Sequence, residues 1–462
     1  MSTQQLEGTH HPRVVIIGGG CAGTFVAANL LRGAGTDTSP LDIVLIERSG
    51  DFGLGVAYST GDDLHLLNVP AAKLGAAVED PADFLAWARK SWGAVEPGDF
   101  LPRALYGRYL QHVLASAEQV SAKSGAVLRR VVGEAIALHP AASGDELHKV
   151  ELADGNMITC DAVVLALGNQ PPHIPDGLPV DCARVYSTPW EPGALAASDG
   201  PTTTLLVGSG LTAVDAALTL GSIDSASRVI ALSRGGQLPH VHLDGGLRDP
   251  APAPTLPDGE LTVELLLTEL RAHLDDATAS GFDWRDVVDG IRPGIPALWG
   301  RLPVAEQRVF LQGYMRAWEV RRHRMAPQSD VRLDQLAEAG RFEVRAGHVV
   351  RVNATDAELE VHIETSGDHE VEVLNVDRVV CCTGPGLDIT ATPEPLVRQL
   401  LVTGVAAPDE HRLGLRATPV GQLVSRAGST TNNVFVLGAL RRGELWETTA
   451  VPEIRAQASQ IA

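Results

Sequence analysis

Short, continuous apolar runs alternate along the chain with segments whose apolar residues recur at helical spacing, a pattern typical of α/β proteins with parallel strands. The first run covers residues 14–17, passes into a glycine-rich turn at 18–23, and leads to a helical pattern at 24–31. A second buried strand over 41–46 ends in Glu47. Strand, turn, helix and terminal acid in this order predict a dinucleotide-binding unit.

Each glycine of the first turn has its own physical role. Gly18 permits the tight turn, Gly20 lets the backbone approach a pyrophosphate, and Gly23 lets the helix pack on the strand. Glu47 stands where a ribose is expected. We expect this unit to bind its dinucleotide through Gly18, Gly20, Cys21, Ala22, Gly23, Glu47 and Arg48.

The pattern repeats much later in the chain. A strand at 204–207 runs into the turn Gly-Ser-Gly-Leu-Thr-Ala at 208–213, then into a helix at 214–220. The following strand, 228–232, ends in Ser233 and Arg234 instead of an acid, and a hydroxyl with a guanidinium suits a 2′-phosphate. This favours NADPH over NADH, the alternative being a surface arginine beside an NAD site. The expected contacts are Gly208, Gly210, Leu211, Thr212, Ser233 and Arg234.

Further strands follow each turn and close on an apolar strand that ends in glycine, at 161–168 and at 377–384. Between the second turn and its closing strand, residues 261–340 carry Leu and Val at helical spacing with Pro or Gly at the breaks, which predicts a helical insertion. The sequence therefore predicts an α/β protein with two Rossmann-like dinucleotide-binding domains, β-meanders and an insertion that covers the cleft between the domains.

Charge and composition narrow the partners. The formal net charge of −20 repels nucleic acid and anionic lipid headgroups, so we expect neither as a partner. The segment MSTQQLEGTHHPR at 1–13 has no signal-peptide pattern and no run reaches about 20 apolar residues, so we expect a soluble, cytoplasmic protein. His240 and His242 have no accompanying ligand cluster, so we expect no metal.

The five cysteines offer no CxxC motif. Cys381 and Cys382 are neighbours in an apolar strand, where their side chains point to opposite faces and are badly placed to form a disulfide. The sequence therefore lacks the cysteine pair that a dithiol mechanism normally uses.

The C-terminal segment 433–455, NVFVLGALRRGELWETTAVPEIR, looks like the third flavin motif of two-dinucleotide-domain flavoproteins. Four further strings are family-like: GVAYST at 55–60, LLNVPA at 66–71, FLPRALYGRYL at 100–110 and WEVRRHRMAP at 318–327. Together they resemble a bacterial FAD/NAD(P)-binding protein family related to flavin-dependent N-hydroxylating monooxygenases, including nitrosuccinate-forming aspartate N-monooxygenases.

The resemblance implies the cofactors FAD and NADPH, with an FAD-binding domain over 1–195 and 385–462 and an NAD(P)H-binding domain over 196–384. It implies a monooxygenase that uses O₂ through C4a-hydroperoxyflavin to N-hydroxylate a small polar amine or amino acid. The alternatives are an NAD(P)H:acceptor flavin oxidoreductase without oxygen insertion and a non-catalytic flavin-binding protein. The substrate and the oligomeric state stay open. The expected FAD contacts in the C-terminal segment are Gly438, Trp446, Thr448, Thr449 and Ala450.

Asn68 resembles the asparagine that related monooxygenases place beside the flavin, where an amide could donate to the peroxide or to NADP⁺. The alternative is a loop asparagine that satisfies its own turn. As substrate contacts we expect Arg324, Arg441 and Arg442, with a solvated charged face as the alternative for the cluster Arg316, Arg321, Arg322, His323 and Arg324. Trp446 could cover a ring or pack in the core, Glu447 could cap amides, and His65 is expected to be structural.

The 2′-phosphate assignment predicts a specific kinetic change in Arg234→Ala. The KM for NADPH should rise by about tenfold or more while the use of NADH barely changes, because a guanidinium–phosphate pair is worth a few kcal/mol. Steady-state kinetics with both nicotinamides measure this. An equal loss with both would contradict the assignment.

Overall fold

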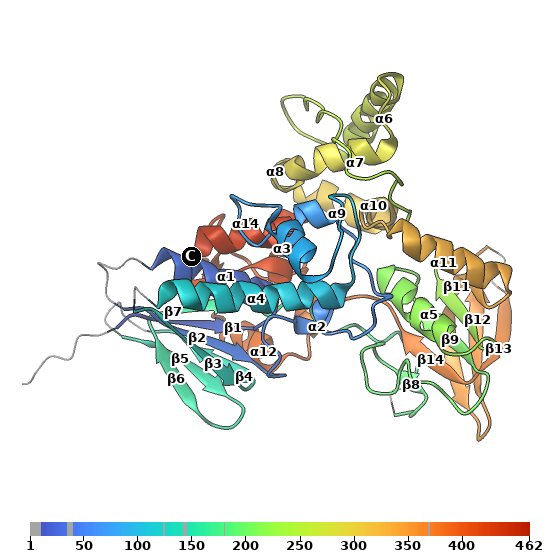
Figure 1. The fold of residues 1–462 in the computed structure, drawn as a ribbon, viewed down its shortest axis with the longest axis horizontal. Helices are drawn as coiled ribbons and strands as arrows, with labels where there is room; N and C mark the ends of the chain where they lie inside the picture. The colour runs from blue at the N-terminus through green and yellow to red at the C-terminus, as the bar shows by residue number, and fades with distance from the viewer. Residues whose placement is uncertain (1–10, 35–39, 123–124, 142–145, 180, 368–369) are drawn as a thin grey trace, which may run out of the picture.

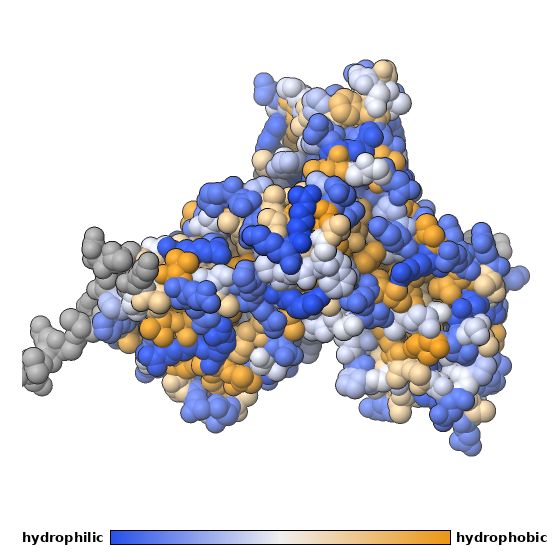
Figure 2. All heavy atoms as spheres, in the orientation of Figure 1, coloured by the Kyte–Doolittle hydropathy of each residue, from blue (hydrophilic) through white to orange (hydrophobic). Residues whose placement is uncertain are grey.

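Two sheet domains and a helical lobe make up the chain, shown by a computed structural model that describes residues 11–34, 40–122, 125–141, 146–179, 181–367 and 370–462. Figure 1 shows the first domain on the left, the second on the right and the helical lobe above them. In Figure 2 the surface is hollowed between the two lower lobes. Residues 1–10, which carried most of the expectation about a signal segment, lie outside the described residues.

The first domain is built on a six-stranded sheet of order β15-β16-β7-β1-β2-β3. Its strands are β1 (Arg13–Ile17), β2 (Asp42–Glu47), β3 (Val127–Val132), β7 (Ala162–Leu165), β15 (Gln422–Val424) and β16 (Thr430–Val436). All neighbours are parallel except β15 and β16. Strands β7 and β16 come from distant parts of the chain and pair in parallel, so the C-terminal segment adds strands to the first sheet.

Alternating strand residues supply two separate cores. Ile16 and Val164 pack on the face covered by α1 (Cys21–Gly33), α4 (Arg103–Ser121) and α14 (Val451–Ile461). Val15 and Val163 pack on the opposite face. That face is covered by α12 (Pro395–Thr403) and the antiparallel strands β4 (Ala135–His139), β5 (His148–Leu152) and β6 (Met157–Cys160). Because both faces are covered, the central strands are continuous apolar runs.

The second domain has a seven-stranded sheet of order β13-β12-β11-β10-β9-β14-β8. Its elements are β8 (Val185–Tyr186), β9 (Thr203–Val207), α5 (Leu211–Ile223), β10 (Arg228–Ser233), β11 (Phe342–Ala354), β12 (Leu359–Thr365), β13 (Val371–Val376) and β14 (Arg378–Cys381). β11 pairs in parallel with β10 and then antiparallel with β12. Since β8 already pairs with β14, the chain reaches the second sheet before residue 195, the boundary expected from sequence.

The insertion forms the third lobe. It contains α6 (Val263–Ala279), α7 (Trp284–Ile291), α8 (Ile295–Arg301), α9 (Val304–Gly313) and α10 (Met315–Arg322). Its last helix, α11 (Pro327–Glu338), packs instead on α5 of the second domain. Between α7 and α8 lies η2 (Arg292–Gly294). The remaining helices outside the insertion are α2 (Gly55–Tyr58), η1 (Ala71–Lys73), α3 (Asp83–Ser91), η3 (Ile389–Ala391), η4 (Gly438–Arg441) and α13 (Arg442–Leu445). Among the described residues, no helix combines the length and apolar character needed to cross a bilayer. The α/β fold with two Rossmann-like units and a helical insertion is confirmed by this arrangement.

A buried polar network joins the two sheet domains. The ring of His65 lies between two hydroxyls, with Nδ1 2.7 Å from Oγ1 of Thr60 and Nε2 2.8 Å from Oγ1 of Thr219 on α5. On the same helix, the carboxylate of Asp215 lies 3.1 Å from the guanidinium of Arg103 on α4. That carboxylate oxygen has no well-aligned hydrogen bond within the described chain, so the contact is mainly Coulombic. His65 is therefore structural, as expected from sequence.

Removing the charge of Arg103 should make stability depend more strongly on pH. Burial raises the pKa of Asp215, and Arg103 opposes that shift. In Arg103→Met the pKa of Asp215 in the folded state rises further. The free energy of unfolding is then highest below the pKa of Asp215 in the unfolded chain, about 4, and falls as the pH rises through its pKa in the folded state. We expect a loss of about 3 kcal/mol at neutral pH, because breaking a buried pair leaves a charge unpaired.

Urea unfolding at about pH 5 and about pH 8 measures this difference. The matched control is the double variant Arg103→Met with Asp215→Asn, which removes the buried charge and should recover most of the loss. An equal loss at both pH values, or none, would refute the account.

Candidate functional site

The first glycine-rich turn is fixed by the strand beside it. A Cβ on Gly18, whose φ is +106°, would come within 2.3 Å of the carbonyl oxygen of Ala166. One on Gly23 would come within 1.9 Å of the oxygen of Gly18. A Cβ on Gly20 would meet only the backbone of Gly55 among the described residues, with Cα 3.4 Å away. No side chain of a described residue caps α1 there. The turn therefore presents uncapped amides at Cys21, Ala22 and Gly23, the arrangement that binds a pyrophosphate.

Glu47 and Arg48 have different surroundings at the end of β2. The carboxylate of Glu47 accepts the N–H of Gly19 at 2.8 Å and groups of Ser49 at 3.1 Å. Each carboxylate oxygen has further lone pairs, so Glu47 can still accept from a ribose. The guanidinium of Arg48 forms a two-pronged pair with Glu394, at 3.2 and 2.9 Å. Arg48 is thus engaged within the protein, and its expected cofactor contact remains a prediction.

The second turn repeats the geometry of the first. A Cβ on Gly208, whose φ is +123°, would lie 2.2 Å from the carbonyl oxygen of Cys382, and Gly210 has open space around it. Helix α5 also begins without a capping side chain from the described residues, with Leu211 and Thr212 in its first turn. At the end of β10, the hydroxyl of Ser233 lies 2.7 Å from that of Ser209, and Arg234 is exposed.

The C-terminal segment brings a third helix start to the first sheet. The hydroxyl of Thr448 donates to the carbonyl of Gly438 at 3.1 Å, and Gln457 bonds both residues. This buried network folds the segment back so that α14 starts beside the end of β16. Ala450 precedes α14, again without a side-chain cap among the described residues, and Thr449 is exposed.

Trp446 and Glu447 attach the insertion to this segment. The indole of Trp446 stacks on that of Trp299 at 5.1 Å and meets the edge of Phe310 at 5.3 Å. The carboxylate of Glu447 accepts from the indole N–H of Trp318 at 3.0 Å and from Nε of Arg322 at 3.2 Å. Both side chains are buried among insertion residues, so core packing accounts for Trp446, and its contact with FAD remains a prediction.

Asn68 is held by its backbone and not by its side chain. Its carbonyl accepts from Nε2 of His242 at 3.1 Å, while its amide makes no hydrogen bond to any residue that the structure describes. His242 also packs against Phe100 with the two rings tilted and their centroids 4.7 Å apart. Burial and the charge of Arg324 lower the pKa of His242 to about 3, so the ring stays neutral. The amide of Asn68 is therefore free for a ligand.

The three arginines expected to meet substrate all have protein partners. Arg441 is buried and bonds Glu444 and two loop carbonyls. Arg442 pairs with Glu319 at 2.8 Å and lies 4.9 Å from the ring centroid of Trp446. Arg324 is 2% exposed and bonds Asp289 at 2.5 Å. These contacts explain their positions without a substrate, and the substrate role stays a prediction.

A buried arginine cluster stands where α14 begins, and sequence reasoning did not single out its member Arg292. Arg292 pairs with Glu453 in the first turn of α14 at 2.6 Å. Burial alone would raise the pKa of Glu447, but Arg322 and His323 beside it lower that pKa overall. Three N–H groups in this cluster have no partner within the described chain: Nε of Arg292, Nη2 of Arg322 and Nε of Arg324. Unpaired buried guanidinium donors point to an anionic ligand or to water at this place.

The cysteine thiols are unsuited to redox exchange. All five are free, and Cys160, Cys381 and Cys382 are buried. Burial raises the pKa of Cys160 to about 12 and that of Cys381 to about 11, and it raises those of Cys21 and Cys382 further. Such thiols stay protonated, and the thiolate is the reactive form. Within the described ranges, no group of three His, Cys, Asp or Glu residues is placed to hold a metal.

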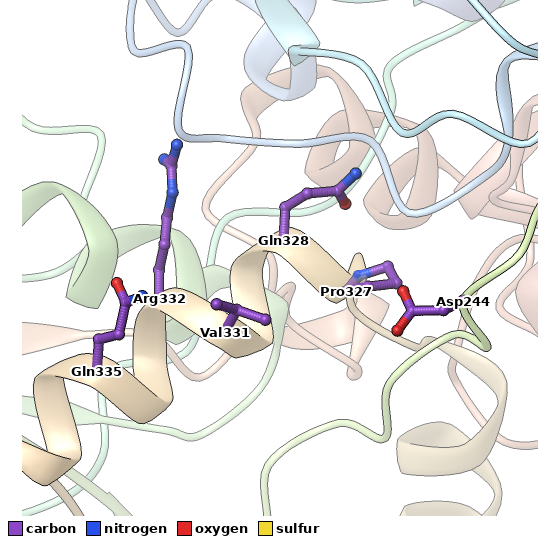
Figure 3. A pocket seen from close by; sticks show the side chains of 6 residues that line it. All are labelled: Asp244, Pro327, Gln328, Val331, Arg332 and Gln335. Atoms are coloured by element: carbon purple, nitrogen blue, oxygen red, sulfur yellow. The ribbon is translucent and has the colours of Figure 1, made fainter.

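A surface pocket of about 380 Å³ lies along α11 (Figure 3). Asp244 lines it together with Pro327, Gln328, Val331, Arg332 and Gln335. In the close-up, Gln328 and Arg332 project to the same side of the helix, and Asp244 lies beside Pro327. The pocket shares no residue with either glycine-rich turn.

Comparison with known proteins agrees with this architecture. Residues 15–170 match a family described as FAD-NAD(P)-binding. No curated protein is significantly similar to the chain in sequence. Among solved structures, the ornithine N-hydroxylase of Kutzneria sp. 744 superposes with a TM-score of 0.61 at 16% identity, over 98% of both chains. The L-lysine 6-monooxygenase of Pseudomonas syringae superposes with a TM-score of 0.65 at 16% identity, again over 98% of both chains.

A third structure, the FAD-bound cadaverine monooxygenase of Erwinia amylovora, has a TM-score of 0.64 at 13% identity, over 98% of this chain and 94% of that chain. At such low identities the likeness establishes the fold. The chain therefore has the two-domain fold of these hydroxylases and monooxygenases, and the first part of its first domain matches the FAD-NAD(P)-binding family.

Proposed function

We propose that the protein is an NADPH-dependent, FAD-containing monooxygenase that N-hydroxylates a small polar amine or amino acid. The observation that carries this proposal is the shared geometry of α1, α14 and α5. Each starts near the carboxyl ends of parallel strands, and no described side chain caps its first amides. Two such starts in the first domain and one in the second suit one FAD and one nicotinamide dinucleotide.

The residues of the first domain fit FAD. Gly20 carries no side chain at the start of α1, and the amides of Cys21 and Ala22 would bind the pyrophosphate. Glu47 would accept from the adenosine ribose. The start of α14 at Ala450 would face the other end of the cofactor, where its dipole stabilises negative charge. When bound, FAD would supply the chemistry, accepting hydride from NADPH and passing electrons to O₂.

The chain's own residues would shape the space around the reacting groups. The amide of Asn68 is free, and the bond from His242 to its carbonyl fixes its backbone, so Asn68 is placed to donate to or accept from a ligand. The aromatic cluster of Trp446, Trp299 and Phe310 holds the insertion against the C-terminal segment and keeps water out of that contact. The protonated thiols argue against a disulfide-reductase mechanism.

The arginine cluster favours an amino acid over a simple amine. Arg292 and Arg322 each have an N–H group without a described partner. Arg292 pairs with Glu453 in the first turn of α14, and Arg322 pairs with Glu447 in the segment before that helix. A substrate carboxylate would satisfy these donors with charge-assisted hydrogen bonds. The substrate amine would then lie on the side of the helix start that faces the flavin.

The experiment is aerobic turnover of the FAD-loaded protein with NADPH and pairs of substrates, each an amino acid and its decarboxylated amine. We expect O₂ consumption to match the amount of N-hydroxylated product, and the amino acid to have a KM at least about tenfold lower because its carboxylate is bound. Hydrogen peroxide alone, or electron transfer to artificial acceptors without product, would favour an acceptor oxidoreductase. Failure of NADPH to reduce the flavin would favour a non-catalytic flavin protein.

Arg292→Gln should weaken substrate binding selectively. The KM for the amino acid should rise by about tenfold, while that for the matching amine should change little, since only the former loses a charge-assisted bond. Arg301→Gln is the matched control, because Arg301 lies in the same lobe, is exposed and, among the described residues, bonds only the carbonyl of Pro257. An equal rise for both substrates would indicate a structural role for Arg292.

A further inference from the structure

Helix α10 carries an arginine from the insertion into the second nucleotide turn. Arg316 stands in the first turn of α10, at the base of the helical lobe (Figure 1). Its Nη2 lies 3.0 Å from the carbonyl of Gln237 and 3.3 Å from the hydroxyl of Ser209. Ser209 is the middle residue of the Gly-Ser-Gly turn, so an insertion residue reaches the nucleotide-binding turn directly.

A second arginine, Arg234, lies near the same glycine-rich turn as Arg316. Arg234 follows β10, is exposed and has no side-chain hydrogen bond to any described residue. Burial lowers the pKa of Arg316, Glu319 opposes the shift, and the charge of Arg234 lowers it further. The remaining N–H groups of Arg316 also have no partner in the described ranges. Arg234 and Arg316 are both exposed and both have N–H groups that a ligand can reach, so two cations of like charge near this turn suit an anion.

A comparison of the two glycine-rich turns indicates which anion would bind beside Arg316 and Arg234. In the first domain the strand after the turn ends in Glu47, whose carboxylate accepts the N–H of Gly19 and would repel a phosphate. In the second domain the same position holds Ser233, whose hydroxyl lies 2.7 Å from that of Ser209. Hydroxyls flanked by two guanidiniums at the ribose position suit a phosphate monoester on the 2′ oxygen.

We propose that Arg316 reads the 2′-phosphate of NADPH together with Arg234, so that the insertion is part of the cofactor-specificity site. The inference rests on the proposed use of NADPH. It also gives α10 a linking role, because the same helix contacts the C-terminal segment 433–455. Trp318 and Arg322 on α10 both bond Glu447 of that segment. One short helix thus touches both nucleotide sites.

The test is calorimetric binding of 2′,5′-ADP and of 5′-AMP to the FAD-loaded protein, which needs no turnover. We expect the wild type to bind 2′,5′-ADP more tightly, and Arg316→Ala to weaken that binding by about tenfold or more with 5′-AMP unchanged. Arg316→Lys, which keeps the charge without the forked geometry, should lose part of the preference. Arg321→Ala is the control, since Arg321 is exposed on the same helix and its side chain bonds only the carbonyl of Ala317 within the part of the chain that the structure describes.

Three outcomes would overturn the proposal. They are wild-type binding without a preference for 2′,5′-ADP, unchanged binding of 2′,5′-ADP by Arg316→Ala, and equal weakening of both ligands by that variant, which would mark a merely structural residue. Circular dichroism and bound flavin content confirm that each variant is folded. Absence of hydroxylated product in the turnover experiment would defeat the proposed reaction and leave this binding result intact.

Discussion

The close approach of a turn glycine to the carbonyl oxygen that ends a neighbouring strand sets the geometry of both domains. At Gly18 the neighbour is Ala166, and at Gly208 it is Cys382. Any side chain at these glycines would push the turn away from the sheet. Because the turn stays close, α1 and α5 begin directly above the sheet edge with free amides. The position of every other group at the two sites depends on that start.

The same backbone supports two different recognition chemistries. Glu47 after the first turn is an acceptor that also fastens the turn through Gly19. Ser233 after the second is part of a hydroxyl pair with cations beside it. The difference needs only a few side chains, because the helix starts supply the common part, which is attraction for a pyrophosphate. The two turns thus differ in the side chains that would distinguish one dinucleotide from another.

Features encoded by neighbouring residues were predictable from the sequence, and features that join distant residues were not. The turns, the strand ends at Glu47 and Ser233, and the helical insertion follow from local spacing, and the sheets confirm the two Rossmann-like units. The arginines show the limit. Arg322 finds Glu447, 125 residues away, and Arg316 finds Ser209, 107 residues away. No periodicity encodes such pairs, since they depend on how the insertion docks, and so Arg292 and the docking role of Trp446 were recognised only in three dimensions.

The two connections between the sheet domains lie against each other. The N–H of Gly386 donates to the carbonyl of Pro171 at 3.1 Å, and the hydroxyl of Thr383 donates to that of His173 at 3.2 Å. The chain thus leaves and rejoins the first domain at one place. The second domain is therefore inserted into the first like a long loop whose two ends lie side by side. A gene segment that encodes such a domain can enter an ancestral single-domain protein by one recombination event without interrupting a strand. The second domain is in this sense a unit that evolution can exchange as one piece.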